Sequence, residues 1–187
     1  MRLAASEAPK TYWYMLYRVV NTTGEDRDFL PVIERVAEID SELPALQVDD
    51  RPGEAPRLLV APALVGLDPA VFRAIRDRHA KTHPFLVAPV ESIGRIKQGA
   101  DYAVDSVAIF EDLDPKVSRF TLYVGGLTGE RTVISNPSFN AKEPASDTNP
   151  RSFVVQKTLA IPYVLPGDEQ TRPAAEPLLK RVTWVMR

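Results

Sequence analysis

The segment from Tyr12 to Val20 is the feature that most restricts how this chain folds. Its odd positions are all apolar, and its even positions are apolar apart from Arg18. Aromatic and β-branched residues with a period of two are typical of a long strand that buries one face fully and the other in part. We therefore expect the odd positions in the core, and Arg18 on the wetter face where substitution is mild.

A turn follows this strand. Asn21 to Asp26 reads NTTGED, which is rich in turn-forming residues, and an extended pattern resumes from Phe29 to Ile39. Two strand patterns on either side of a short turn are the signature of a β-hairpin. The sequence thus predicts a sheet protein that opens with a hairpin.

The segment from Leu67 to His79 is the clearest helix pattern in the chain. Asp68 is a favoured N-cap residue, and a proline at the first helical position follows it. Val71, Phe72 and Ile75 fall on one apolar stripe, which is expected to pack on this same chain. Pro84 disfavours helical geometry just before it, so the helix should end there.

The remainder of the chain is predicted to be β. The expected strands share short apolar runs bounded by turn residues, and they are Arg57–Ala61, Phe85–Val87, Ser106–Phe110, Phe120–Val124, Glu130–Ile134, Phe153–Val164 and Val182–Met186. Pro162 interrupts one run and predicts an edge position or a bulge there. Together with the helix, these runs predict a mainly β protein, an immunoglobulin-like β-sandwich with one helical insertion. Residues 1–187 would form a single domain, with the insertion at about 67–83 and a flexible loop at about 136–152.

Composition excludes several classes of function. The chain has 23 basic and 25 acidic residues, intermixed along its 187 positions, so it lacks the basic footprint of a nucleic-acid-binding protein. It has no cysteine, so disulfides and thiolate metal sites are excluded. No apolar run approaches the roughly 18 residues that a membrane span requires. The first ten residues hold no apolar stretch, so no signal peptide is expected within this chain.

Two segments carry a family resemblance. YWYMLYRVVNTTGEDRDFLP resembles the first hairpin of immunoglobulin-like, telokin-like domains of exported bacterial proteins, and DSVAIFEDLDPKVSRFTLYVGGLTGE is similar to their central strands. The ending LAIPYVLPGDEQTRP with KRVTWVM looks like a narrower group of uncharacterised bacterial proteins. The resemblance implies an exported or periplasmic protein that is not an enzyme, and it transfers no catalytic residue.

Three groups of residues suggest a metal hypothesis. His79 and His83 have the spacing that places two imidazoles on one helix face, but Ala80 stands where zinc hydrolases carry a glutamate. The acidic run from Glu111 to Asp114, like the pair Asp101 and Asp105, offers oxygen ligands for calcium but lacks the glycine and distal glutamate of an EF-hand. A helix-end histidine and solvated turns explain these residues better, so no metal and no cofactor are expected.

The chain has no complete nucleotide-binding or nucleophile motif, because the residues around each candidate do not match the motif. Gly125 to Gly129 is glycine-rich, but a strand pattern follows it where the dinucleotide fingerprint requires a helix. Ser106 and Ser118 lack the G-x-S-x-G context of a nucleophile elbow. No catalytic residue is predicted.

Three hypotheses of function remain. The first is a non-catalytic binding or structural module that holds another protein, with Arg73 and Arg76 in a small basic patch on the helix. The second is a carbohydrate or small-molecule module in which Tyr12 and Tyr14 form a stacking platform, although ordinary packing of these rings on the sheet is the simpler interpretation. The third is a metal-dependent hydrolase built on His79 and nearby acids.

Overall fold

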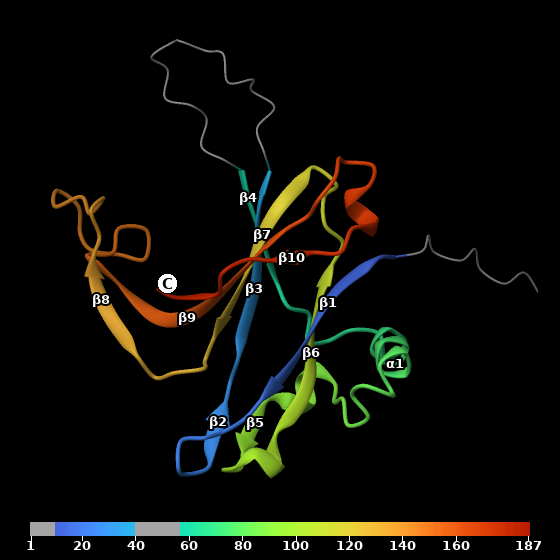
Figure 1. The fold of residues 1–187 in the computed structure, drawn as a ribbon. Helices are drawn as coiled ribbons and strands as arrows, with labels where there is room; N and C mark the ends of the chain where they lie inside the picture. Colours follow the sequence, from blue (N-terminus) through green and yellow to red (C-terminus); the bar gives the residue numbers. More distant parts are fainter. Residues whose placement is uncertain (1–9, 40–56) are drawn as a thin grey trace, which may run out of the picture.

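The computed structural model describes residues 10–39 and 57–187, and in them the protein is a mainly β sandwich with one helical insertion (Figure 1). The strands in chain order are β1 Tyr12–Val19, β2 Arg27–Phe29, β3 Val32–Ile39, β4 Arg57–Pro62, β5 Gly94–Ile96, β6 Val104–Glu111, β7 Val117–Gly125, β8 Arg131–Ser135, β9 Ser152–Val164, β10 Leu178–Leu179 and β11 Thr183–Met186. The α-helix α1 spans Pro69–Arg78, and short 3-10 turns span Pro89–Ser92, Ala100–Tyr102 and Arg172–Ala174.

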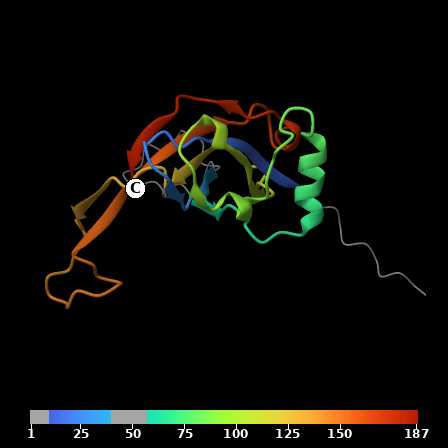
Figure 2. The ribbon, with the colours of Figure 1, turned by 90° about the horizontal axis from the view of Figure 1, so that it is seen from below.

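One antiparallel sheet dominates the molecule. Its strand order is β10-β9-β7-β3-β4, and β11 and β8 also pair with β9. The long strand β9 pairs with different strands along its length. Its first part pairs with β8 and its last part pairs with β7. The β8–β9 pair projects from the body as an arm, at the end of the molecule opposite α1 (Figure 2).

The predicted opening hairpin is wrong. β1 pairs with β6, with Trp13 opposite Phe110 and Val19 opposite Val104, whereas β2 pairs with β5. β3, the expected hairpin partner of β1, pairs with β4 and β7 instead. The reason is packing: β1 and β6 both carry apolar side chains on two faces, one of which packs on the main sheet and the other on the helix layer.

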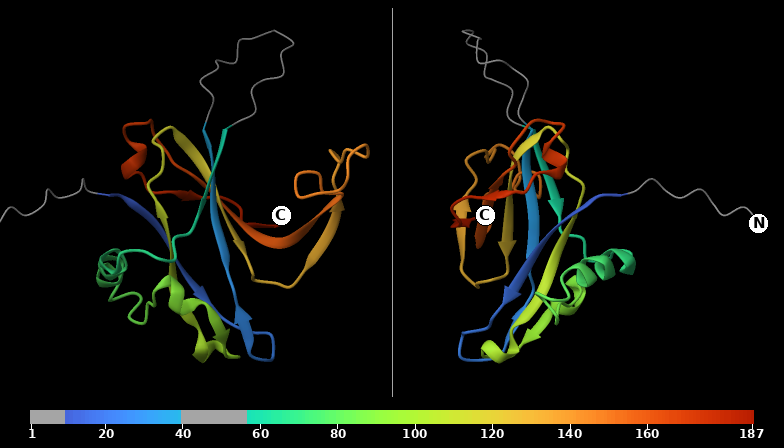
Figure 3. Two further views of the ribbon diagram at one scale, coloured as in Figure 1. Left: turned by 180° about the vertical axis from the view of Figure 1, so that it is seen from behind. Right: turned by 45° about the vertical axis from the view of Figure 1, so that its right-hand side comes forward.

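The β1–β6 ribbon lies between the main sheet and α1, so the molecule has three layers (Figure 3). On one side, Ala108 and Phe110 of β6 pack with the inward residues of the main sheet, and Trp13, Met15 and Tyr17 join them. On the other side, Val107 and Ile109 pack with Ile75 and Leu86, and Tyr12, Tyr14 and Leu16 join them. The predicted alternation of β1 is therefore confirmed, but the prediction that one face is fully buried is wrong, because the residues on both faces are half-buried and Arg18 is exposed.

The helix forms where the sequence predicts it. The Asp68 carboxylate accepts a hydrogen bond of 2.8 Å from the Ala70 N–H, which satisfies one of the free donors of the first turn. Ile75 is buried, and Val71 and Phe72 pack beside it against the ribbon. The apolar stripe thus packs on its own chain, as expected.

Two of the strand predictions need correction. Phe85–Val87 is not a strand: Phe85 is 81% exposed in a turn, and Leu86 alone enters the core. Pro162 lies in β9 between two paired strands and not at an outer edge, but it occupies the gap where β10 ends and β11 has not begun. Its carbonyl accepts from Lys180 N at 2.8 Å, so the side of Pro162 that lacks an N–H faces this gap in the ladder.

The segment predicted as a flexible loop is rich in hydrogen bonds. Asn149 is buried, and its amide nitrogen donates to the carbonyls of Asn140 and Pro144 at 3.1 and 3.2 Å. Asn136 donates to the Pro150 carbonyl at 2.7 Å, which closes the base of the segment. These contacts give the segment a defined path, and its flexibility stays a prediction.

Arg18 has a role that the sequence conceals. It is exposed, but it donates two hydrogen bonds of 2.5 and 2.7 Å to the buried carboxylate of Asp105, the residue opposite it on β6. The hydrogen bond from Arg18 lowers the pKa of Asp105 against the opposing effect of burial. The expectation that substitution of Arg18 is mild is therefore revised.

This pair predicts a pH-dependent effect on stability. Because the pKa of Asp105 is lower in the folded protein than the value of about 3.9 in the unfolded chain, the ionised carboxylate stabilises the fold at pH values above about 3.9. This stabilisation is lost as the pH falls through the pKa of Asp105 in the folded protein. Arg18→Gln should thus lower the melting temperature at pH 7, and its difference from the wild type should shrink in acid. Thermal melts between pH 7 and pH 2 measure this, with the exposed Arg73→Gln as the matched control. A difference that stays constant across this range would contradict the assignment.

Candidate binding groove and aromatic pocket

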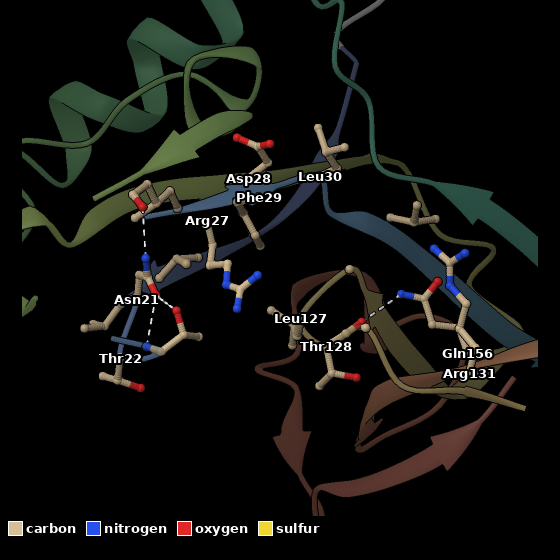
Figure 4. Close-up of a pocket in the computed structure, with 17 residues that line it drawn as sticks. Asn21, Thr22, Arg27, Asp28, Phe29, Leu30, Leu127, Thr128, Arg131 and Gln156 are labelled. Atoms are coloured by element: carbon tan, nitrogen blue, oxygen red, sulfur yellow. Dashed lines mark hydrogen bonds between the residues drawn. The ribbon is translucent and has the colours of Figure 1, made fainter. Parts of the chain in front are cut away.

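An open groove lies between the turn that joins β1 to β2 and the corner that joins β7 to β8 (Figure 4). Its volume is about 790 Å³, within the range of ligand sites. One wall comes from Val19–Thr23 and Arg27–Leu30, and the other from Gly126–Gly129, Arg131 and Gln156. Leu30 is 63% exposed and Leu127 38% exposed, so the groove offers apolar surface that solvent still reaches.

Asn21 fixes the first wall. Its side chain is buried, and the amide nitrogen donates to the carbonyls of Glu25 and Ile96 at 2.8 and 3.0 Å. The amide oxygen accepts from the N–H and the hydroxyl of Thr23 at 3.1 and 2.8 Å. One side chain therefore holds the turn together and ties it to β5, as Asn does in many turns.

Gly126 and Gln156 shape the second wall. Gly126 has a φ of +81°, a conformation that favours glycine, and it passes close to the backbone of Leu30, where the two walls of the groove meet. The Gln156 amide donates to the Thr128 carbonyl at 3.2 Å, which anchors the corner to β9. The glycine-rich segment, which leads into a strand and not into a helix, thus lines one wall of the groove.

The charged residues of the groove are mostly arginines. Arg27 and Arg131 reach into the hollow from opposite walls (Figure 4). Arg27 pairs with Glu25, and the carboxylate of Asp28 lies 3.6 Å from Arg95. Arg131 forms no ion pair within the described residues. The groove therefore carries a positive charge that an anionic ligand would neutralise.

The predicted binding residues lie elsewhere. Tyr12 and Tyr14 are half-buried and pack toward α1, and the Tyr14 hydroxyl shares a hydrogen bond of 2.8 Å with Nε2 of His79. Arg73 and Arg76 are exposed on α1, and Arg76 lies 5.9 Å from the centre of the Phe72 ring. The structure thus brings the four residues to the helix end of the molecule, away from the groove, and binding by them stays a prediction.

The metal candidates have other partners. The rings of His79 and His83 lie 6.0 Å apart at 85°, an edge-on contact. Asp112 accepts from Trp13 Nε1 at 3.1 Å and from Leu113 N at 2.8 Å, and Asp114 accepts from Lys116 N at 2.9 Å. In the described residues, no group of three or more histidines and carboxylates lies close enough to hold an ion.

A second, smaller hollow lies between the ribbon and the main sheet. It has a volume of about 200 Å³, and its lining is aromatic except for Arg35, Glu176 and a few aliphatic side chains. Sequence reasoning missed it, although the signal was present: Arg35 occupies an inward position of the alternating strand β3, where Ile33 and Ala37 are its neighbours. We call this hollow the aromatic pocket.

Comparison of the chain with protein-family models, curated proteins and solved structures found no match. Among the described residues, no helix is long and apolar enough to cross a membrane.

Proposed function

We propose that this protein is a non-catalytic binding module of an exported bacterial protein, and that it holds an acidic, extended segment of another protein in the groove. The observation that carries the proposal is the pair Arg27 and Arg131, which enter the groove from opposite walls, with Arg131 unpaired within the described residues. Export rests on the family resemblance.

The edge of β8 supports an extended partner. Of the described strands, β8 pairs with β9 alone, so its other edge keeps free backbone donors and acceptors. The segment Thr132–Ser135 carries no charge and no proline, the devices that usually protect an edge strand from pairing. Val133 and Ile134 are also exposed. A partner strand that adds to this edge would gain backbone hydrogen bonds there and reach Arg131 at its end.

The test uses a fluorescent peptide of about six residues, a usual strand length, that alternates valine and aspartate. Its lysine counterpart is the charge control. The aspartate peptide should bind, and Arg131→Glu should weaken its affinity by about tenfold or more. The substitution removes the positive charge that pairs with an aspartate and puts a repelling negative charge in its place. Salt should weaken the interaction as well.

Arg73→Glu is the matched control, since it makes the same charge change on the helix. Binding that is insensitive to Arg131→Glu, or equal for the two peptides, would contradict the groove as the site. A loss that follows Arg73→Glu or Arg76→Glu would instead assign the partner to the basic patch on α1.

A further inference from the structure

The starting point is a charge in an apolar layer. Arg35 is 6% exposed and points from β3 into the core cluster between the main sheet and the ribbon. An apolar side chain would fit this inward position at lower cost, because burying a charge without a paired partner is unfavourable. Position 35 carries an arginine although packing in the core would favour an apolar side chain there.

Two backbone carbonyls accept hydrogen bonds from this guanidinium. Its two terminal nitrogens donate to the carbonyls of Glu111 and Asp112 at 2.9 and 3.1 Å, and it lies 5.5 Å from the centre of the Phe110 ring. A guanidinium has five N–H donors and these two bonds use two of them, but both terminal nitrogens have a partner, and no buried side-chain nitrogen of the described residues is left without one. No carboxylate of these residues forms a salt bridge with it, although the nearby charges of Asp112 and Glu111 raise its pKa against the effect of burial. Burial lowers the pKa of Arg35, but an arginine stays protonated at neutral pH.

The pocket beside Arg35 is a cage of rings. Phe120 and Tyr163 stack with centroids 5.2 Å apart, and Trp13 meets Phe120 edge-on at 6.5 Å. The hydroxyl of Tyr163 makes no hydrogen bond within the described residues. Glu176 is exposed and belongs to the segment that borders the pocket. The hollow thus combines flat apolar walls with one cation, the carboxylate of Glu176 and one hydroxyl without a hydrogen bond in the described residues.

We propose that the aromatic pocket binds a small carboxylate with one ring, whose carboxylate pairs with Arg35 and whose ring packs among Trp13, Phe120 and Tyr163. A volume of about 200 Å³ has room for one ring and a short acidic arm. A carboxylate is the group whose two oxygens match the paired N–H donors of a guanidinium. This site is separate from the groove and uses none of its residues.

The test reads the fluorescence of Trp13. Trp184→Phe leaves Trp13 as the only tryptophan, because the chain has two. Phenylacetate is titrated against phenylacetamide, which has the same shape without the charge. Phenylacetate should change the emission and bind at least about tenfold more tightly than the amide, the usual worth of a hydrogen bond to a charged group.

Arg35→Met should remove this preference for the acid while the protein stays folded, since apolar residues replace buried charges well. Glu176→Gln should tighten phenylacetate by removing a like charge near the pocket, and Arg131→Glu in the groove should leave it unchanged. Equal affinity for acid and amide in the parent protein would overturn the proposal, whether or not Arg35→Met folds. An Arg35→Met protein that still prefers the acid would overturn it as well.

Discussion

Truncation of Phe110 to alanine should lower the free energy of unfolding by about 3–5 kcal/mol, the usual cost of removing a buried aromatic side chain. Phe110 is 2% exposed, and it stands in the layer between the ribbon and the main sheet. Its ring also faces the guanidinium of Arg35, so the truncation removes a cation–π contact together with the packing. Urea denaturation of the two proteins measures the difference.

Phe85→Ala is the matched control, because it removes the same side chain from a site that is 81% exposed. Its free energy of unfolding should stay within about 0.5 kcal/mol of the parent, as for most surface substitutions. Equal losses at the two positions would show that the layer assigned to Phe110 is wrong.

Gly126→Ala should cost about 1–3 kcal/mol of stability, the range for a non-glycine residue held in a left-handed conformation. The φ of +81° alone accounts for a cost of this size, and the close approach to Leu30 adds to it. A Cβ atom at Gly126 would lie 2.3 Å from the carbonyl oxygen of Leu30, which is backbone and cannot swing away. The two walls of the groove would have to separate, so binding of the aspartate peptide should weaken too.

Gly129→Ala supplies the control in the same corner. A Cβ atom there would have no atom within 4 Å, and the residue lies outside the left-handed region. Denaturation and peptide binding should therefore be close to those of the parent. If Gly126→Ala behaves like Gly129→Ala in both measurements, the walls are not in the contact described.

Local patterns predicted most individual elements. Asp68 followed by proline marks the start of α1, because a capping carboxylate and a preset φ act within one turn of the chain. The runs around Val107, Leu122 and Leu159 are strands for an equally local reason, namely β-branched and apolar side chains in series. The two-residue strand β10 and the three-residue strands β2 and β5 were not predicted, because two or three residues are too few to show an alternating pattern.

The choice of partner for each strand was not local. A turn between two strand patterns favours a hairpin, yet β1 pairs with β6, which lies far along the chain. Packing between layers decides such a case, because β3 carries the half-buried Glu34 and Glu38 on the face opposite its core residues, whereas β1 packs apolar side chains on both faces. For the same reason, the sequence did not predict that the exposed Arg18 pairs with the buried Asp105 on a distant strand.

By itself the sequence determined a mainly β protein with one capped helix, because strand and helix periods, caps and turn residues act over a few neighbouring positions. Only the tertiary structure decided that the ribbon lies between sheet and helix, that Gly126 contacts the backbone of Leu30 where the walls of the groove meet, and that Arg35 enters a pocket lined by aromatic rings. Each of these depends on residues from distant strands that meet in one place, and no local pattern encodes such a meeting.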